Sequence, residues 1–116
     1  MSTPDCIFCA IVAGTLPSQQ VHTTEHSVAF RDLSPQAPVH VLVVPRRHIA
    51  DAAALGPDDG HVLADMFAAA RHVAESEGIV RSGYRLVFNV GDDACNSVPH
   101  LHLHVVGGRQ LSGSAG

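Results

Sequence analysis

The longest regular pattern of apolar residues lies between residues 56 and 77. Apolar side chains recur there at intervals of three and four, which is the spacing of one face of an α-helix. Gly56-Pro57-Asp58-Asp59 predicts the start, because proline is tolerated in a first helical turn and acids suit the N-terminal dipole. We expect the helix to reach about Glu77, with Asp65, Arg71, His72 and Glu75 on its polar side. The face expected to pack on a sheet carries Val62, Leu63, Met66, Phe67, Ala69, Ala70, Val73 and Ala74.

Shorter apolar runs predict a short helix and several strands. The short helix covers Cys6 to Ala13 and ends at Gly14. Strands are expected at Val21–Thr23, Ser27–Arg31, His40–Val44, Tyr84–Val90 and His100–Val106. The loop GDDACNSVP joins the last two, so an antiparallel hairpin is the simplest connection between them. The predicted class is α+β.

Composition narrows the class of protein. A chain of 116 residues with 46% hydrophobic content fits one domain, which we expect over residues 1–108, followed by a small polar tail over 109–116. Seven basic against eleven acidic residues leave a net charge of −4 and no basic stripe for long nucleic acids. No segment resembles a signal peptide, and none approaches the roughly 18 apolar residues of a membrane span. We therefore expect a cytoplasmic protein that binds neither nucleic acid polymers nor membranes.

The stretch HLHLHVV, residues 100–106, alternates three histidines with apolar residues. Residues two apart on a strand share a face and lie about 6.6–6.8 Å apart, so His100, His102 and His104 are expected on one face. The opposite face would pack under the long helix and carries Leu101, Leu103 and Val105. A row of imidazoles suits either metal ligation or nucleophilic and acid–base chemistry near neutral pH. Spacing alone leaves both open.

Two of the three cysteines stand as Cys6-x-x-Cys9, while Cys95 lies far along the chain. In a reducing compartment this spacing indicates metal or redox chemistry more than a structural disulfide. The alternative is a pair of buried thiols on one apolar helix face, because residues three apart share that face.

The motifs CIFCAIVAG, FRDLSPQAPVHVLVVPRRH, FNVG and NSVPHLHLHVV together resemble the histidine triad (HIT) family. The GGRQ that follows resembles its Hint branch, the histidine-triad nucleotide-binding proteins. The resemblance implies a five-stranded antiparallel sheet with one long and one short helix, continued across a homodimer. It also implies that the protein binds a purine nucleotide such as AMP or GMP. The implied reaction is hydrolysis of a bond to the α-phosphate of a purine nucleoside monophosphate derivative of the phosphoramidate type, through a covalent nucleotidyl-histidine intermediate and with no metal needed for the reaction.

The resemblance further implies roles for single residues. His102 matches the nucleophile, His104 a contact to phosphate oxygens, Ser97 a hydroxyl beside the phosphate and leaving group, and His40 an auxiliary histidine. Asp32 matches the carboxylate that binds both ribose hydroxyls. The apolar slot for the base matches Ile7, Phe8, Ile11 and Leu33. Further donors to the phosphate could come from Asn89 and from the backbone amides of Cys95 and Val98.

A second site is implied by the same resemblance. Cys6, Cys9, His48 and His100 resemble the Cys2His2 zinc site of many bacterial members, and zinc in a structural role favours four closed N and S ligands. The chain departs from the Hint pattern at Cys95-Asn96, where glycine and glutamine are usual, and in a tail without tryptophan. Two other functions stay open: a dinucleoside polyphosphate hydrolase, or a nucleotide-binding or zinc-stabilised interaction protein with incidental turnover.

Overall fold

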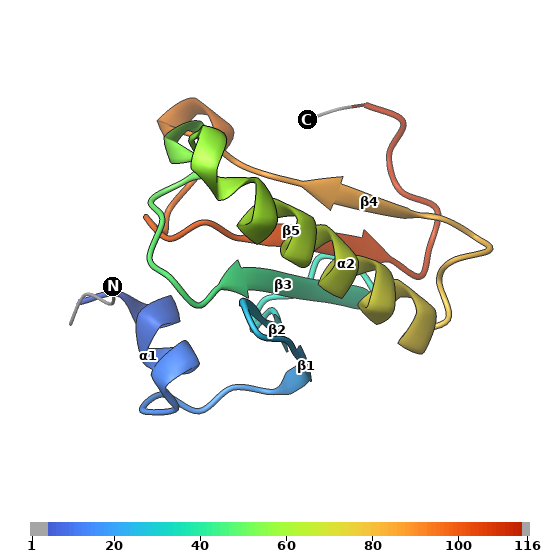
Figure 1. Cartoon of the computed structure of the whole chain (residues 1–116). Coiled ribbons are helices and arrows are strands. Elements are labelled where there is room, and N and C mark those ends of the chain that lie inside the picture. Colours follow the sequence, from blue (N-terminus) through green and yellow to red (C-terminus); the bar gives the residue numbers. More distant parts are fainter. Residues whose placement is uncertain (1–4, 115–116) are drawn as a thin grey trace.

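A five-stranded antiparallel sheet forms the centre of the computed structural model, which describes residues 5–114 (Figure 1). The strands run in the order β1-β2-β3-β5-β4, so β1 and β4 are the two edges. A long helix, α2, crosses one face, and a short helix, α1, contributes to the packing of the other (Figure 1). The strand bounds are β1 Gln20–Thr23, β2 Ser27–Arg31, β3 Val39–Pro45, β4 Tyr84–Val87 and β5 Leu103–Gly107. The predicted α+β class is confirmed.

Helix α2 spans Gly60–Ser76 and is preceded by a 3-10 turn over Pro57–Asp59, so the predicted helix begins with a tighter turn. Most of the predicted apolar face is buried, but Phe67 is 40% exposed and lies edge-on to Phe88 at the rim of the core. Within residues 5–114, neither this helix nor any other is long and apolar enough to cross a membrane.

Asp65, predicted on the polar side of α2, is half-buried and bonded there to two hydroxyl groups. Its carboxylate accepts hydrogen bonds of 2.6 Å from the hydroxyls of Thr24 and Ser27. Thr24 lies in the turn between β1 and β2, and Ser27 is the first residue of β2. A buried hydroxyl needs such a partner, because leaving it unpaired costs about 1–3 kcal/mol. This contact ties α2 to the β1–β2 hairpin.

Strand β3 is buried along its whole length because both faces of the sheet are covered. Val41 and Val43 point to the α2 side and belong to its core cluster, whereas Leu42 and Val44 belong to the cluster built around α1. A strand covered on both faces needs a continuous apolar run rather than an alternating one. VHVLVVP has that pattern and becomes the central strand.

Two strands are shorter than predicted. Strand β5 begins at Leu103, because the backbone N–H groups of His100 and Leu101 donate to Val98 and Ile49 outside the sheet. Strand β4 ends at Val87, which is opposite His104. The predicted division of faces still holds: the apolar residues between the histidines lie in the α2 core, namely Leu101, Leu103 and Val105.

Helix α1 covers Ile7–Ala13 and ends, as predicted, at Gly14, whose φ of 80° is the left-handed conformation that glycine adopts readily. Cys6 caps the other end, where its sulfur accepts a hydrogen bond from the Cys9 N–H. The buried side of α1 carries Phe8, which lies edge-on to Phe30 and to His102 with ring centroids 5.5 and 5.2 Å apart. Helix α1 thereby forms one wall of the site described next.

Candidate functional site

A cavity of about 400 Å³ opens between α1, the end of β2 and the segment after β4. Every residue predicted to bind the nucleotide lines it, so residues from both ends of the chain meet at one place. Their roles stay predictions. Six lining residues were missed, namely Leu16, Pro17, Ser18, Phe30, Arg31 and Leu42. The sequence held a signal for Phe30 and Leu42, because both are apolar residues of predicted strands. Their side chains lie on the sheet face that packs against α1.

One end of the cavity is apolar. Its floor is made by buried side chains from α1 and the sheet, among them Phe8, Ile11 and Leu42. Its rim is open, since Ile7 is 51% exposed and Leu33 is 97% exposed. Such a slot offers contact area to a flat apolar group but few hydrogen bonds to select it.

The other end holds His102 and His104, whose ring centroids are 5.1 Å apart. His102 Nδ1 lies 2.7 Å from the backbone oxygen of His100. A carbonyl oxygen only accepts hydrogen bonds, so this nitrogen carries the proton and donates it. The unprotonated Nε2 of a neutral His102 therefore keeps a lone pair.

His104 is held in the opposite tautomer through His40. The backbone N–H of Gln36 donates to His40 Nδ1 at 3.0 Å, so in neutral His40 the proton is on Nε2. That Nε2 lies 2.9 Å from His104 Nδ1, which accepts it and leaves the proton of His104 on Nε2. Burial, with smaller effects from the His102 and His40 rings, lowers the pKa of His104 to about 4. His104 is therefore a neutral hydrogen-bond donor near pH 7.

Asp32 lies at the meeting point of this histidine pair and the cavity. One carboxylate oxygen accepts from the Ser34 N–H at 2.8 Å, and the other lies 3.4 Å from His40 Nε2. Asp32, His40 and His104 are close enough to hold a metal ion. The hydrogen bond from His40 Nε2–H to His104 Nδ1 accounts for the closeness of the two rings.

The loop beside the histidines carries the remaining predicted residues. Asn89 donates one side-chain N–H to the Ala94 backbone oxygen at 2.9 Å and so stabilises the loop. The second N–H of the amide is not used in this hydrogen bond. Cys95 has a φ of 62°, a left-handed conformation that is unfavourable for residues with a Cβ. This is the position where the Hint pattern has glycine. Ser97 is exposed at the cavity.

A second cluster lies behind α1 and contains the predicted metal ligands Cys6, Cys9, His48 and His100. His100 Nδ1 lies 3.2 Å from Cys6 Sγ, 3.5 Å from Cys9 Sγ and 3.2 Å from His48 Nδ1. Cys9 Sγ lies 3.3 Å from His48 Nδ1. Ligand atoms around a tetrahedral zinc ion are separated by about 3.3–3.8 Å, given its bond lengths to N and S. The four side chains are compatible with a structural zinc site.

The tautomer of His100 also fits metal ligation. Its Nε2 lies 2.9 Å from the Pro45 backbone oxygen and must carry the proton, so Nδ1 presents its lone pair to the cluster. The ring is fully buried, and this burial lowers the pKa of His100. A neutral imidazole is the form that binds a metal.

The chain is similar to members of one protein family over most of its length. A model of the HIT domain family matches residues 13–111. The chain belongs to the HIT family. This HIT protein is 40% identical over 109 residues to an uncharacterized 13.2 kDa HIT-like protein of Azospirillum brasilense, covering 93% of this chain and 89% of that one. It is 42% identical to a HIT family hydrolase of Legionella pneumophila, with a TM-score of 0.94 over 97% of this chain and all of the other.

A third similar structure belongs to a protein that is described as zinc-bound. The Zn-bound histidine triad family protein of Mycobacterium smegmatis is 32% identical, with a TM-score of 0.79 over 90% of this HIT protein and 76% of that chain. The family match begins at residue 13, so Cys6 and Cys9 lie before it. The assignment to the Hint branch stays a prediction.

Proposed function

We propose that this protein hydrolyses derivatives of purine nucleoside monophosphates at the bond between the α-phosphate and an amine leaving group. The observation that carries this proposal is a pair of opposite histidine tautomers in one cavity. His102 presents an unprotonated Nε2, and His104 presents an Nε2–H. A nucleophile needs a lone pair, and an N–H stabilises charge that develops on a phosphate oxygen.

The reaction proceeds in two steps. First, the Nε2 lone pair of His102 forms a bond to the α-phosphorus while the bond from phosphorus to the leaving nitrogen breaks. The leaving group takes the electron pair of that bond and a proton, with the exposed Ser97 hydroxyl as the relay from solvent. Second, a water molecule attacks phosphorus, the bond to His102 breaks with its electron pair returning to Nε2, and the water releases a proton to solvent. The products are the amine and the nucleoside monophosphate, which retains the oxygen of the water.

The same cavity orients the nucleotide. Asp32 accepts hydrogen bonds from the two ribose hydroxyls, which a carboxylate can do with both oxygens. The base lies in the apolar slot between α1 and Leu33, where contact area is large and hydrogen bonds are few. Recognition of this kind discriminates weakly between adenine and guanine.

We infer that Cys6, Cys9, His48 and His100 hold a structural zinc ion. The distances among their ligand atoms and the tautomer of His100 support this. When bound, the ion cross-links α1 to the segments before β5 and after β3. Phe8 on α1 packs against both His100 and His102, so this link positions one wall of the reactive cavity.

We also propose a homodimer in which the sheet continues through β4. Of the two edge strands, β1 exposes the polar Gln20 and Thr23. Strand β4 exposes Leu86, and the neighbouring Phe67 of α2 is equally exposed. A small chain gains a larger shared core by covering such an edge with a second copy. Light scattering at micromolar concentration should give twice the mass of one chain.

The reaction is tested by trapping its intermediate. Rapid-quench mass spectrometry of the protein with an adenosine 5′-phosphoramidate should detect a transient adenylyl adduct on the peptide that contains His102. The His102→Ala variant is the control and should form none. Binding without any turnover would contradict the proposal and favour a nucleotide-binding protein. Faster turnover of a diadenosine polyphosphate than of the phosphoramidate would favour a dinucleoside polyphosphate hydrolase.

A further inference from the structure

A second cavity, of about 310 Å³, lies on the same face of the sheet as the first. Arg85 is opposite Val106, and Val87 is opposite His104, so all four side chains share one face. The α2 core cluster takes the other face of β5, through Leu103 and Val105. The second cavity therefore lies on the sheet face that carries His104, on the side toward β4.

The two cavities meet at the side of the reactive site that His104 forms. His104 and Asn89 line both of them, whereas His102 lines only the first. In an in-line displacement the leaving group departs on the side of phosphorus opposite the nucleophile. His104 borders both cavities and His102 only the first, so a phosphate that is bound at His104 and attacked from His102 can release its leaving group toward the second cavity. The nucleotide and the leaving group would then occupy separate cavities.

The charge of the second cavity is its distinctive property. Arg85 donates to the Ser112 backbone oxygen at 2.6 Å, and Arg109 donates to the Gln36 backbone oxygen at 2.9 Å. Carbonyl oxygens orient a guanidinium but do not neutralise it. Across residues 5–114, neither arginine has a carboxylate partner within salt-bridge distance, unlike Arg31 with Glu77 and Arg47 with Asp59. The residues that line the cavity include no aspartate or glutamate.

Both arginines are exposed, and the cavity that they line offers them no acidic side chain. A guanidinium presents a planar fork of N–H donors that matches a carboxylate or a phosphate. Both arginines also retain N–H groups beyond those used by the carbonyl oxygens, since each guanidinium has five. The cavity is suited to an anion.

We propose that the second cavity is a leaving-group subsite, and that Arg85 and Arg109 select leaving groups that carry a carboxylate or phosphate away from the bond that is cleaved. This inference rests on the proposed function. The bonds that form and break are those of the two-step reaction above, and the leaving amine still takes the electron pair and a proton. The arginines hold the distant anion and exchange no proton.

The test compares leaving groups that differ in one charge. One pair of adenosine 5′-phosphoramidates carries β-alanine or its neutral amide, and a second pair carries phosphoethanolamine or ethanolamine. The ratio of kcat/KM for the anionic over the neutral member should be roughly 10 or more in at least one pair, as expected for a charge-assisted contact. The pair with the larger ratio distinguishes a carboxylate from a phosphate. Ratios near one in both pairs would overturn the proposal.

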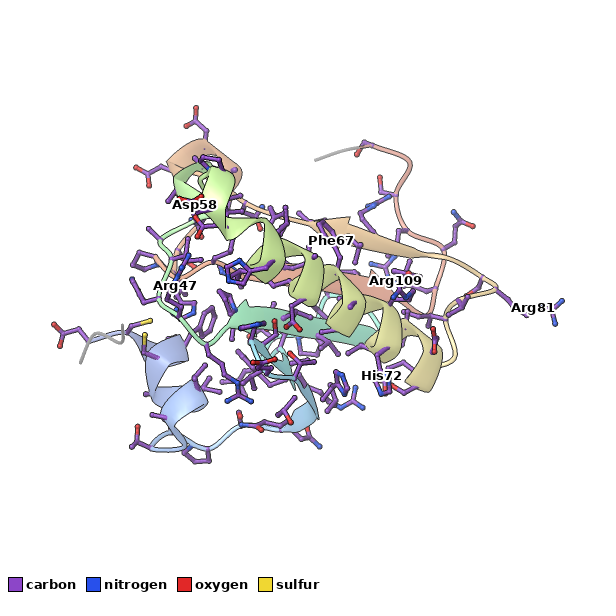
Figure 2. The ribbon with its side chains drawn as sticks, viewed as in Figure 1. Arg47, Asp58, Phe67, His72, Arg81 and Arg109 are labelled. Atoms are coloured by element: carbon purple, nitrogen blue, oxygen red, sulfur yellow. The ribbon has the colours of Figure 1, made fainter. Side chains whose placement is uncertain are left out.

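Substitution then assigns the preference to the arginines. In the double variant Arg85→Gln with Arg109→Gln, the ratio of kcat/KM for the anionic over the neutral substrate should fall to near one. Both values are measured on the same variant, so their ratio does not depend on the fraction of the protein that is folded. Arg81→Gln is the matched control, since Arg81 projects into open space away from both cavities (Figure 2) and should leave the ratio unchanged. If the glutamine variant does not fold, Arg85→Lys with Arg109→Lys should keep a reduced preference. A ratio that survives in the glutamine variant, or is undiminished with lysine, would overturn the proposal. If none of the four compounds is cleaved, that result would count against the proposed function instead.

Discussion

His100 and His102 are separated by one residue but lie in opposite chemical settings. His100 is fully buried, its Nε2–H is bound to a backbone oxygen, and its Nδ1 faces two thiols and a second imidazole. His102 is bound to a backbone oxygen through the other nitrogen, and its ring lines an open cavity. In each case one carbonyl selects the tautomer and thereby the nitrogen that remains reactive. The closed setting suits metal ligation, and the open one suits attack on a substrate.

The two settings share a wall. Phe8 lies edge-on to both rings, with centroids 5.9 Å from His100 and 5.2 Å from His102. Cys6 and Cys9 at the start of α1 belong to the closed cluster. Substitutions in the closed cluster should therefore affect the open site only indirectly, by changing the position of α1.

The largest effect is expected at the open site. His102→Ala removes the attacking nitrogen and should lower kcat by roughly 10³-fold or more while nucleotide affinity changes little. His104→Ala keeps the nucleophile and should cost about 10²-fold to 10³-fold, as expected for the loss of one donor to the oxyanion. Steady-state kinetics with a phosphoramidate measure both. Near-normal turnover in His102→Ala, with turnover lost in His104→Ala, would reverse the two assignments.

The next largest effect is expected at the closed cluster. Purified protein should contain about one zinc ion per chain, and Cys6→Ser with Cys9→Ser should abolish it and lower Tm by roughly 10 °C or more. The loss of kcat should be much smaller than in His102→Ala, because the reactive nitrogen remains. Metal analysis and thermal unfolding measure these changes, with Cys95→Ser as the matched control that retains the metal. Wild-type protein refolded with zinc but containing none would contradict the zinc site.

The smallest effect concerns protons at His104. Its pKa is about 4 in the folded protein and about 6.5 in the unfolded chain, so the unfolded chain binds more protons between these values. His104 should therefore lower the free energy of unfolding as the pH falls from about 6.5 toward 4, by up to about 3 kcal/mol, and have no such effect above pH 7. Urea unfolding at pH 7 and pH 5 measures this. The His104→Gln variant should lose part of the pH dependence, and an unchanged dependence would show that other groups cause it.

The amino-acid sequence by itself determined which elements form and which faces they bury. The spacing of apolar residues between Val62 and Ala74 predicted α2, because helical periodicity is a local property of the chain. The alternation in HLHLHVV predicted that Leu101, Leu103 and Val105 would pack on one side and the histidines on the other. The family resemblance supplied the positions that the cavity brings together.

Only the tertiary structure decided the partners of polar groups. The contacts of Asp65 with Thr24 and Ser27 join groups that are distant in sequence. The tautomer of His104 likewise depends on His40, which lies on another strand. Arg85 and Arg109 enter one cavity because β4 pairs with β5 and the chain turns back after Gly108. Hydrophobic burial is non-directional and can be anticipated from a pattern, whereas a hydrogen bond needs two specific atoms within about 3 Å. That pairing is settled only when the chain is folded.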